Sequence, residues 1–452
     1  MSADRRVDTI AAIATAAGRG AIGILRLSGP RAFDIADRMT GPEVAPRQAR
    51  LRVFRDTTGT AVDRGLVLRF PGPHSYTGED VVELQGHGGP VVLNLLLQAA
   101  CELGARPARA GEFSERAFLN DRLDLAQAEA VADLIDAASR AAVQAAHRSL
   151  EGVFSRSVQD LAQTLLELRV YVEGALDFSD EDIDWLADAQ LDTRLQQAAL
   201  AFEDLLGRAA QGRRLRDGIH LAIVGQPNVG KSTLLNALAG TEAAIVSSRP
   251  GTTRDVLREH LLIDDLPVTV VDTAGLRDTE DQVEAEGIRR AWVALRQAEL
   301  VLFLVDDQIG WTDRDQSLFR QIPDEIDRLI VFNKIDASGR AAGVSERAGV
   351  EALRLSAVTG AGLDGLRETI RRLAGVQGQV EGTFSARGRH LDALRRAQAH
   401  LTETRSVLAA GTQVELAAEE LRLAHEALGE ITGRVTTDDM LGAVFSRFCI
   451  GK

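Results

Sequence analysis

The chain has 452 residues, a formal net charge of −14 and 45% apolar residues. A chain of this length is too long for a single hydrophobic core, so we expect about three domains. Its negative net charge disfavours binding to nucleic acid, unless RNA contacts a local basic patch or is bound together with a second protein. The two cysteines, Cys101 and Cys449, cannot build a disulfide framework or a zinc site, and no apolar run is long enough to span a bilayer.

The first 120 residues mix short β-type runs with glycine and proline turns. Strands are predicted at 21–27, 65–70 and 81–88, and an apolar helix at 90–103. This pattern indicates a small α+β domain.

Helical periodicity without proline covers residues 121 to about 215 and returns from about 387 to 447. Between these segments, apolar strands alternate with helical stretches, which is typical of a parallel sheet covered by helices on both faces. The strands are predicted at 221–225, 268–272, 301–306, 329–334 and 352–357.

The simplest organisation is an α/β domain inserted into an all-α helical domain. Two independent helical domains flanking the insert are the alternative. The expected boundaries are 1–120 for the α+β domain, 121–217 and 377–452 for the helical domain, and 218–376 for the inserted domain.

Residues 225–232 read GQPNVGKS, which matches the P-loop pattern between a predicted strand and a predicted helix. Gly225 and Gly230 allow the backbone N–H groups to face phosphate oxygens. Lys231 adds charge on the outer phosphates, and Ser232 presents a hydroxyl to Mg²⁺. An ordinary glycine-rich turn is the alternative for this pattern taken alone.

The motif NKID at 333–336 specifies the base. Asp336 can accept hydrogen bonds from N1–H and the exocyclic amine of guanine, whereas adenine has an acceptor at N1. Asn333 and Lys334 would brace the base and the loop, and Ser356 and Ala357 in LSAVTGAG (355–362) would form a turn beside it. The sequence therefore predicts GTP as the ligand.

Two switch-type segments lie between these motifs. In PGTTRD (250–255), Thr253 is the expected second Mg²⁺ ligand. In DTAG (272–275), Asp272 would reach Mg²⁺ through water, and Gly275 would donate to the γ-phosphate. Leu276 follows where many such switches have a glutamine that orients water, so the chain is either a passive GTP-sensing module or takes its catalytic group from elsewhere.

The chain resembles the MnmE (also TrmE) family of tRNA-modifying GTPases along essentially its whole length. Similar to the family's signatures are GQPNVGKSTLLNALAG, PGTTRDVLREH, DTAGLRDTEDQVEAEGIRRAW, GRGAIGILRLSGPRAF, PGPHSYTGEDVVELQGHGGP, GEFSERAFLNDRLDLAQAEAVADLIDA and the terminal LGAVFSRFCIGK. The resemblance implies a GTP hydrolase of the P-loop (Ras-like) class that acts in tRNA modification.

For hydrolysis, the resemblance implies that Glu284 orients the attacking water in place of glutamine. K⁺ would replace an arginine finger, with Asn228 as side-chain ligand and carbonyls from the 247–253 loop completing the site when two GTPase domains meet. Arg249 stands where relatives commonly have an apolar residue. Its guanidinium would compete with K⁺ only if it turned inward.

For the N-terminal domain, the resemblance implies a constitutive homodimer that binds a one-carbon folate, a 5-formyl- or 5,10-methylene-tetrahydrofolate. The matching positions are Arg26, Glu83, Arg122 and Lys452. Cys449, on the tail, would be either a nucleophile or acid or a small buried residue that docks the tail. His87 in QGHGGP is expected to be packed rather than catalytic.

The resemblance also implies a partner, the FAD- and NADH-binding flavoprotein MnmG (GidA), in a heterotetramer. Together they would install an aminomethyl or carboxymethylaminomethyl group on C5 of the wobble uridine of certain tRNAs. No flavin-binding G-x-G-x-x-G follows a strand here. A cytoplasmic location without a membrane partner is expected, and a regulatory or ribosome-assembly GTPase without RNA chemistry is the competing function.

The complete set of predicted site residues has three parts. The catalytic residues are Glu284 and Cys449. The metal ligands are Ser232 and Thr253 for Mg²⁺, and Asn228, Ser247, Arg249 and Thr252 for K⁺. The nucleotide- and folate-binding residues are Asn228, Val229, Gly230, Lys231, Ser232, Thr233, Ser247, Thr252, Thr253, Asp272, Thr273, Ala274, Gly275, Asn333, Lys334, Asp336, Ser356, Ala357, Arg26, Glu83, Arg122 and Lys452.

Overall fold

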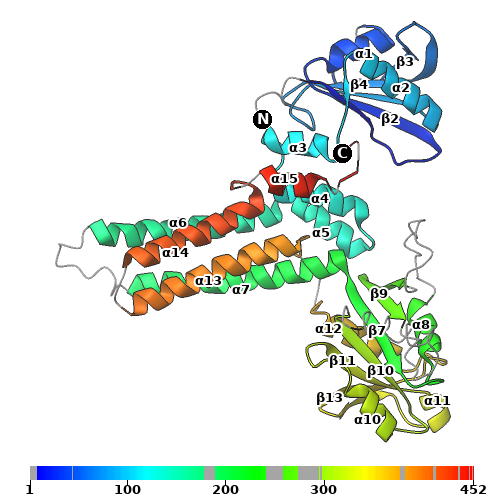
Figure 1. Ribbon diagram of the computed structural model, residues 1–452, viewed down its shortest axis with the longest axis vertical. Helices are drawn as coiled ribbons and strands as arrows, with labels where there is room; N and C mark the ends of the chain where they lie inside the picture. Colours follow the sequence, from blue (N-terminus) through cyan, green and yellow to red (C-terminus); the bar gives the residue numbers. More distant parts are fainter. Residues whose placement is uncertain are drawn as a thin grey trace, which may run out of the picture. The chain divides into compact units, whose positions relative to one another are not determined.

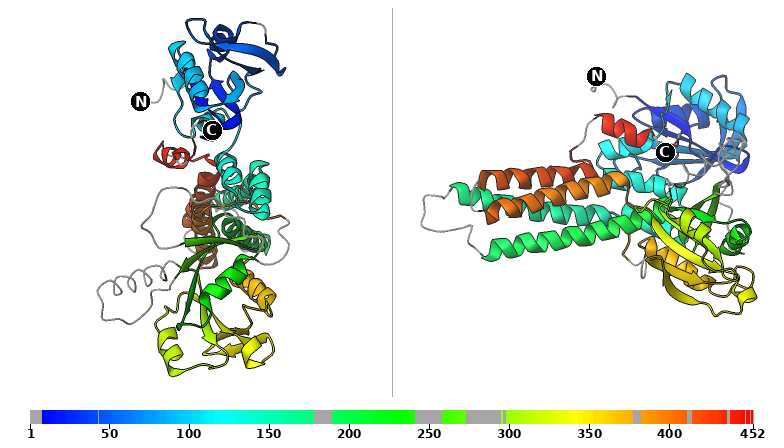
Figure 2. Two further views of the ribbon diagram at one scale, coloured as in Figure 1. Left: turned by 90° about the vertical axis from the view of Figure 1, so that its right-hand side faces the viewer. Right: turned by 60° about the horizontal axis from the view of Figure 1, so that its bottom comes forward.

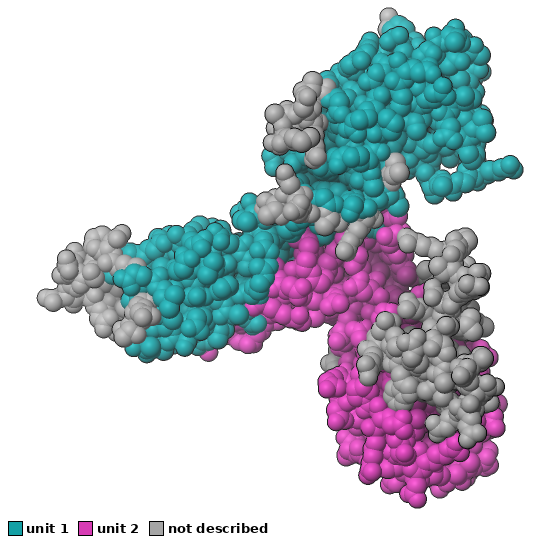
Figure 3. Space-filling view, viewed as in Figure 1, with its two compact units in different colours: residues 1–132, 150–195, 396–452 teal, residues 133–149, 196–395 magenta. Residues whose placement is uncertain are grey.

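The computed structural model describes residues 8–42, 44–177, 189–240, 258–272, 295, 298–376, 382–410, 414–435, 438–446, 448–449 and 451. The chain forms two compact units (Figure 3). Unit 1 comprises residues 1–132, 150–195 and 396–452, and unit 2 comprises residues 133–149 and 196–395.

A six-stranded sheet forms the N-terminal part of unit 1. Its strands are β1 (Ile10–Ile13), β2 (Gly20–Ser28), β3 (Arg50–Arg55), β4 (Ala61–Phe70), β5 (Val81–Gly88) and β6 (Arg106–Pro107), in the spatial order β3-β4-β5-β2-β1-β6. Neighbouring strands are antiparallel except β1 and β6. The three predicted strands are confirmed, and the predicted apolar helix is α2 (Pro90–Glu102).

Helices α1 (Ala32–Thr40) and α2 cover one face of this sheet (Figure 1). Val67 of β4 and Leu84 of β5 point to that face and pack with Ile35 of α1 and Leu96 of α2 in one buried cluster. The predicted α+β class is therefore confirmed. Helices α1 and α3 (Glu112–Leu119) were not predicted, because segments of this length are too short for helical periodicity to stand out.

Further helices, most of them longer than α1 and α3, account for the segments predicted to be helical. They are α4 (Leu125–Asp136), α5 (Arg140–Leu150), α6 (Val153–Asp177), α7 (Ala189–Asp217), α13 (Gly388–Ala409), α14 (Val414–Thr432) and α15 (Asp438–Phe445). In unit 1, α6 and α14 lie side by side (Figures 1 and 2). None of the described helices combines the length and apolar character that a membrane span requires.

A seven-stranded sheet forms the centre of unit 2. Its strands are β7 (Ile219–Gly225), β8 (Arg258–Ile263), β9 (Leu266–Asp272), β10 (Leu300–Asp306), β11 (Asp327–Asn333), β12 (Gly343–Arg347) and β13 (Val350–Arg354), in the order β12-β13-β11-β10-β7-β9-β8. The five predicted strands form its parallel interior. The antiparallel edge strands β8 and β12 were not predicted.

The β8–β9 connection explains one of these edge strands. Asp264 and Asp265 have φ angles of 44° and 69°. Two consecutive positive φ angles are what a two-residue type I′ hairpin turn requires. The two aspartates of the sequence IDDLP therefore form the turn of a hairpin, and this hairpin adds β8 to the edge of the sheet.

Helices cover both faces of this sheet, as predicted. Leu302 of β10 packs in a cluster with Leu234 of α8 (Lys231–Ala239) and Leu366 of α12 (Leu363–Leu373). The next residue, Phe303, packs with Phe319 of α10 (Asp313–Phe319) in a separate cluster. Because β10 is buried on both sides, it reads as a continuous apolar run rather than an alternating one.

One carboxylate connects the two chain segments that flank this sheet. Asp133, near the end of α4, accepts hydrogen bonds from Arg216 Nε at 2.7 Å, Arg387 Nη2 at 2.6 Å and the Ser385 hydroxyl. Arg216 lies in the last turn of α7, just before β7, whereas Ser385 and Arg387 lie between α12 and α13. The Asp133 cluster therefore ties both ends of the α/β segment to α4.

Candidate nucleotide and folate sites

The P-loop connects β7 to α8, and two glycines allow it to curl. Gly230 has a φ of +96°, and a Cβ there would lie 2.4 Å from Nδ2 of Asn333. A Cβ on Gly225 would lie 2.4 Å from the carbonyl oxygen of Leu304. Both positions therefore require glycine, because any side chain would collide with a neighbouring strand or with Asn333.

Lys231 lies at the start of α8 and folds back over the loop. Its Nζ donates to the carbonyl oxygens of Gly225 and Gln226, each at 2.9 Å. Ser232 and Thr233 are exposed, whereas Val229 is buried. The ammonium and the hydroxyls at this helix N-terminus can donate to nucleotide phosphates, and a hydroxyl oxygen can coordinate Mg²⁺.

Asn333 joins the base-recognition loop to the P-loop. This residue is 2% exposed, and its Nδ2 donates to Val229 O at 2.9 Å while its Oδ1 accepts from Ala357 N at 3.0 Å. Ser356, fully buried, donates from its hydroxyl to Asp336 at 2.5 Å. The carboxylate of Asp336 is therefore held on an exposed residue beside the P-loop, where a guanine base can meet it.

Lys334 adds a second link, and its partner was not predicted. Its Nζ donates to Asn228 O at 2.6 Å and to Asp306 at 2.7 Å. Asp306 ends β10, between β7 and β11 in the sheet. An acid directly after a buried parallel strand could have revealed it, because the carboxyl ends of such strands line the ligand-binding edge.

Gln226, the second P-loop residue, is fixed by α10. Its Nε2 donates to Thr312 Oγ1 at 3.1 Å and to Asp315 Oδ1 at 2.7 Å. Thr312 and Asp315 also form the capping box of α10. The sequence contained this box as T-x-x-D, but nothing in it pointed to the P-loop.

Several predicted residues lie outside the part of the chain that the structure describes. They are Ser247, Arg249, Thr252, Thr253, Thr273, Ala274, Gly275, Glu284 and Lys452. Asp272 ends β9, but its side chain is not among those described. The switch chemistry predicted for these positions stays a prediction.

In unit 1, Arg26 and Glu83 face each other across β2 and β5. Arg26 donates through Nε at 3.0 Å and Nη2 at 2.9 Å to the same oxygen of Glu83. Its guanidinium also lies 5.6 Å from the ring centre of Tyr76 and 5.7 Å from that of Phe113. An ion pair flanked by two aromatic rings offers charge, hydrogen bonds and stacking surface to a flat heterocyclic ligand.

The C-terminal tail docks beside this pair. Gly451 has a φ of +98°, and its carbonyl oxygen lies 3.5 Å from Arg26 Nη1. Phe448 is buried against Phe445, with ring centres 5.5 Å apart, whereas Cys449 is exposed. Phe448 rather than Cys449 therefore anchors the tail, and the alternative of a buried, docking cysteine is wrong.

Arg122 is exposed, and its side chain lies against the 71–80 loop, which also carries Tyr76. A Cβ on Gly78 would lie 3.3 Å from Cγ of Arg122, and Tyr76 of this loop lies under Arg26. The structure thus places Arg26, Glu83 and the tail together, with Arg122 at the other end of a short loop.

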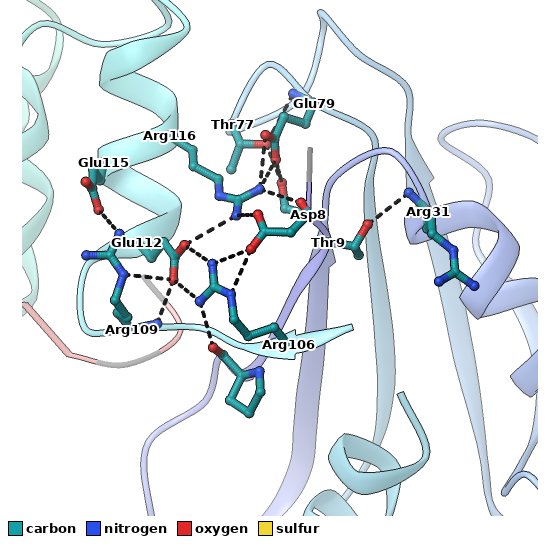
Figure 4. A network of polar contacts seen from close by, with 12 residues as sticks. Asp8, Thr9, Arg31, Thr77, Glu79, Arg106, Arg109, Glu112, Glu115 and Arg116 are labelled. Atoms are coloured by element: carbon teal, nitrogen blue, oxygen red, sulfur yellow. Dashed lines mark hydrogen bonds and ion pairs between the residues drawn. The ribbon is translucent and has the colours of Figure 1, made fainter. Parts of the chain in front are cut away.

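A network of ion pairs holds α3 and the 71–80 loop in place (Figure 4). Arg116 donates to Asp8 at 2.6 Å, Glu79 at 3.1 Å and Glu112 at 3.3 Å. Arg106 also pairs with Asp8 and Glu112. Burial by itself raises the pKa of Glu112, but hydrogen bonds from Arg106 and a backbone N–H outweigh it, so the pKa is lowered.

His87 was expected to be packed, and this was wrong. Its side chain is 75% exposed, and Nδ1 lies 2.7 Å from Asp63. Asp63 also accepts from the backbone N–H of His87 at 2.7 Å. Gly86 makes room for this carboxylate, because a Cβ there would lie 2.4 Å from it. The strand end is therefore organised around Asp63 rather than around a buried imidazole.

Comparison with known proteins covers the whole chain. A family model described as the GTP-binding protein TrmE N-terminus matches residues 9–122, and one described as the MnmE helical domain matches residues 125–449. The tRNA modification GTPase MnmE of Marinobacter nauticus is 52% identical over 455 residues, covering 98% of this chain and 99% of that protein. The protein of the same name from Stutzerimonas stutzeri is 53% identical over 450 residues, with 98% and 99% covered.

Among solved structures, a variant of Era from Aquifex aeolicus bound to GDP and AlF₄⁻ is 29% identical. It covers 40% of this chain and 66% of its own, with a TM-score of 0.28.

The family models span both the N-terminal sheet and the helical segments, and the P-loop and guanine-recognition loop lie between those segments. Relatives that are more than half identical match nearly every residue of the chain. The chain therefore belongs to the MnmE (TrmE) family of tRNA modification GTPases.

Proposed function

We propose that this protein hydrolyses GTP in a K⁺-dependent reaction coupled to dimerisation of its GTPase domains. With the flavoprotein MnmG, in a heterotetramer, it installs an aminomethyl or carboxymethylaminomethyl group on C5 of the wobble uridine of certain tRNAs. A one-carbon tetrahydrofolate is the carbon donor. The domain boundaries are those expected from the sequence, 1–120, 121–217, 218–376 and 377–452, and the protein acts in the cytoplasm without a membrane partner.

The observation that carries the GTPase part is the contact between Asn333 and Val229 at 2.9 Å. It joins the guanine-recognition loop to the phosphate-binding loop, so one ligand can occupy both. Lys231 then contacts the outer phosphates, and Ser232 and Thr253 hold Mg²⁺, which neutralises charge on the phosphates when bound.

The K⁺ dependence is supported by the geometry of Asn228. This exposed residue has a positive φ of 65°, and Lys334 fixes its carbonyl oxygen at 2.6 Å. An exposed P-loop asparagine on a braced backbone suits the role of a fixed side-chain ligand. A bound K⁺ supplies positive charge that offsets charge developing at the transferred phosphoryl group. Glu284 orients the attacking water.

The folate part is supported by Arg26, Glu83 and the docked tail. Glu83 can accept from donors on a pterin ring, while Arg122 and Lys452 hold the anionic tail of the folate. Cys449, exposed beside Gly451, is available as a nucleophile or acid.

The homodimer is supported by the face of the N-terminal sheet opposite α1 and α2. Leu51 of β3 and Leu66 of β4 are paired across the strands and are 53% and 39% exposed. Their strand neighbour Val67 points the other way, into the core. A second copy of this domain fits this open apolar face. In a symmetric dimer each copy covers the other with the same patch, so the patch is removed from water in both copies.

The decisive experiment measures GTP turnover against K⁺ concentration while energy transfer between dyes on the two GTPase domains of the dimer follows their approach with GDP and aluminium fluoride. Turnover should rise with K⁺ and not with Na⁺, in step with the rise in energy transfer. Glu284→Ala should lose turnover while retaining GTP binding, and Glu286→Ala, from the same segment, is the matched control. Equal turnover in Na⁺ and K⁺, or full activity of Glu284→Ala, would refute the mechanism.

A further inference from the structure

The segment that leads from α1 into β3 concentrates positive charge on an acidic chain. Residues 38–55 contain five arginines and one carboxylate, Glu43, whereas the whole chain has 66 acidic and 52 basic residues. Glu43 lies outside the described residues. We name the five arginines the basic rim; they are Arg38, Arg47, Arg50, Arg52 and Arg55. Since β3 is an outer strand, Arg50, Arg52 and Arg55 lie along one margin of the sheet, whereas Arg38 belongs to α1 and Arg47 to the segment between α1 and β3.

Within the described residues, no arginine of the basic rim forms an ion pair with a carboxylate. Four of them donate side-chain hydrogen bonds to neutral acceptors. Arg47 donates to His74 O at 2.7 Å, Arg50 to Gln48 Oε1 at 3.1 Å, Arg52 to Pro42 O at 3.3 Å and Arg55 to Gly59 O at 2.9 Å.

Other arginines of the same domain behave differently. Arg69 pairs with Asp37, and Arg106 pairs with both Asp8 and Glu112. The nearest acid on the hairpin, Asp56, is occupied by backbone N–H groups of its own turn at 2.9 Å. No carboxylate of the described residues therefore neutralises the charge of the basic rim.

The strand geometry repeats this charge at a regular spacing. Arg50 and Arg52 are two residues apart on β3, so their side chains leave the same face about 7 Å apart. They pair with Val67 and Gly65 of β4, which places them on the face that carries α1. The open face with Leu51 and Leu66 remains available for a second copy of the chain.

We propose that the basic rim binds the sugar–phosphate backbone of the substrate tRNA. The inference rests on the proposed function, which supplies the RNA, and assigns the contact to this chain rather than to the flavoprotein alone. A row of unneutralised cations suits a polyanion, because each contact releases a condensed counterion. Arginines on an outer strand also hinder pairing between sheet edges, but that role would not make RNA binding depend on them.

The test measures binding of an in vitro transcribed tRNA with a wobble uridine to the full-length chain, alone and with the flavoprotein, between 50 and 300 mM KCl. Arg50→Gln/Arg52→Gln removes two contacts. The slope of log K against log salt should fall in magnitude by about 1.4–1.8, and the affinity at 0.1 M by about 25- to 60-fold, at 0.7–0.9 counterions per phosphate. Arg50→Lys/Arg52→Lys should retain the slope, because lysine also binds phosphate.

The matched control is Arg395→Gln/Arg422→Gln, which removes the same charge from arginines paired with Asp392 and with Glu419 and Glu426. It should leave the slope unchanged. If wild-type protein binds tRNA and the Arg50/Arg52 variant binds with the same slope, the inference is wrong and the proposed function stands. If wild-type protein and its flavoprotein complex do not bind tRNA at all, both are wrong.

Discussion

The Asp133 cluster yields the most direct prediction about stability. Asp133→Ala removes a carboxylate whose side chain is 4% exposed and leaves Arg387, 11% exposed, and Arg216, 31% exposed, without their shared acceptor. Breaking a buried ion pair by removing one partner costs about 3–5 kcal/mol. A cavity of about 80 Å³ beside Asp133 can admit water to the guanidinium groups, and Arg216 keeps its ion pair with Asp217, so we expect the lower end, about 3 kcal/mol.

For a domain of 150–250 residues, each kcal/mol lowers the melting temperature by about 2–4 °C. Asp133→Ala should therefore lower the transition of unit 2 by about 6–12 °C in calorimetry, while GTP binding survives at low temperature because no nucleotide contact is lost. Arg387→Ala should add little in the Asp133→Ala background. A shift below 2 °C would refute the reasoning, since the carboxylate would then be dispensable.

Three further predictions concern the two sites and the N-terminal domain. Gly230→Ala should reduce GTP affinity at least 100-fold in a fluorescent-nucleotide titration, because its Cβ would lie 2.4 Å from Asn333; near-normal affinity would contradict the packing argument. The pKa of Glu112 is lowered in the folded state, so the ionised carboxylate stabilises the fold above its unfolded pKa of about 4.3, and this stabilisation is lost as the pH falls through the folded pKa. In urea unfolding, the free energy of unfolding should therefore decrease less between pH 6 and pH 3.5 for Glu112→Gln than for wild type, and an equal decrease would count against this reasoning. Phe448→Ala should release the tail and weaken folate binding, as measured by calorimetric titration, whereas Cys449→Ser should leave folate affinity unchanged and lower only tRNA modification; the reverse pattern would mean that the cysteine, not the phenylalanine, docks the tail.

Features that depend on a few adjacent residues were predictable. The P-loop and NKID motifs are local, because the chemistry of phosphate and base recognition requires particular residues at fixed spacing on a strand–loop–helix. The five interior strands of the α/β sheet were also predictable, since burial on both faces leaves an apolar run in the sequence. Short elements such as α1 and the edge strand β12 have neither signal.

Contacts between distant residues were not predictable. Asn333 and Val229 are 104 positions apart, and Asp133 and Arg387 are 254 apart. Each of these residues, taken singly, has many equally good partners in a chain of 452 residues. His87 shows the same limit, because its exposure follows from Asp63 on a neighbouring strand rather than from its own glycine-rich surroundings.

The sequence by itself determined the ligand class and the family, since both depend on short motifs whose order along the chain is the information. Only the tertiary structure decided that Phe448 anchors the tail beside Arg26, that Asp306 braces Lys334, and that the arginines of β3 have no acidic partner among the residues that the structure describes. The physical reason is that hydrogen bonds and ion pairs act over a few ångströms in space, and a linear sequence does not specify which distant side chains the folded backbone brings within that range.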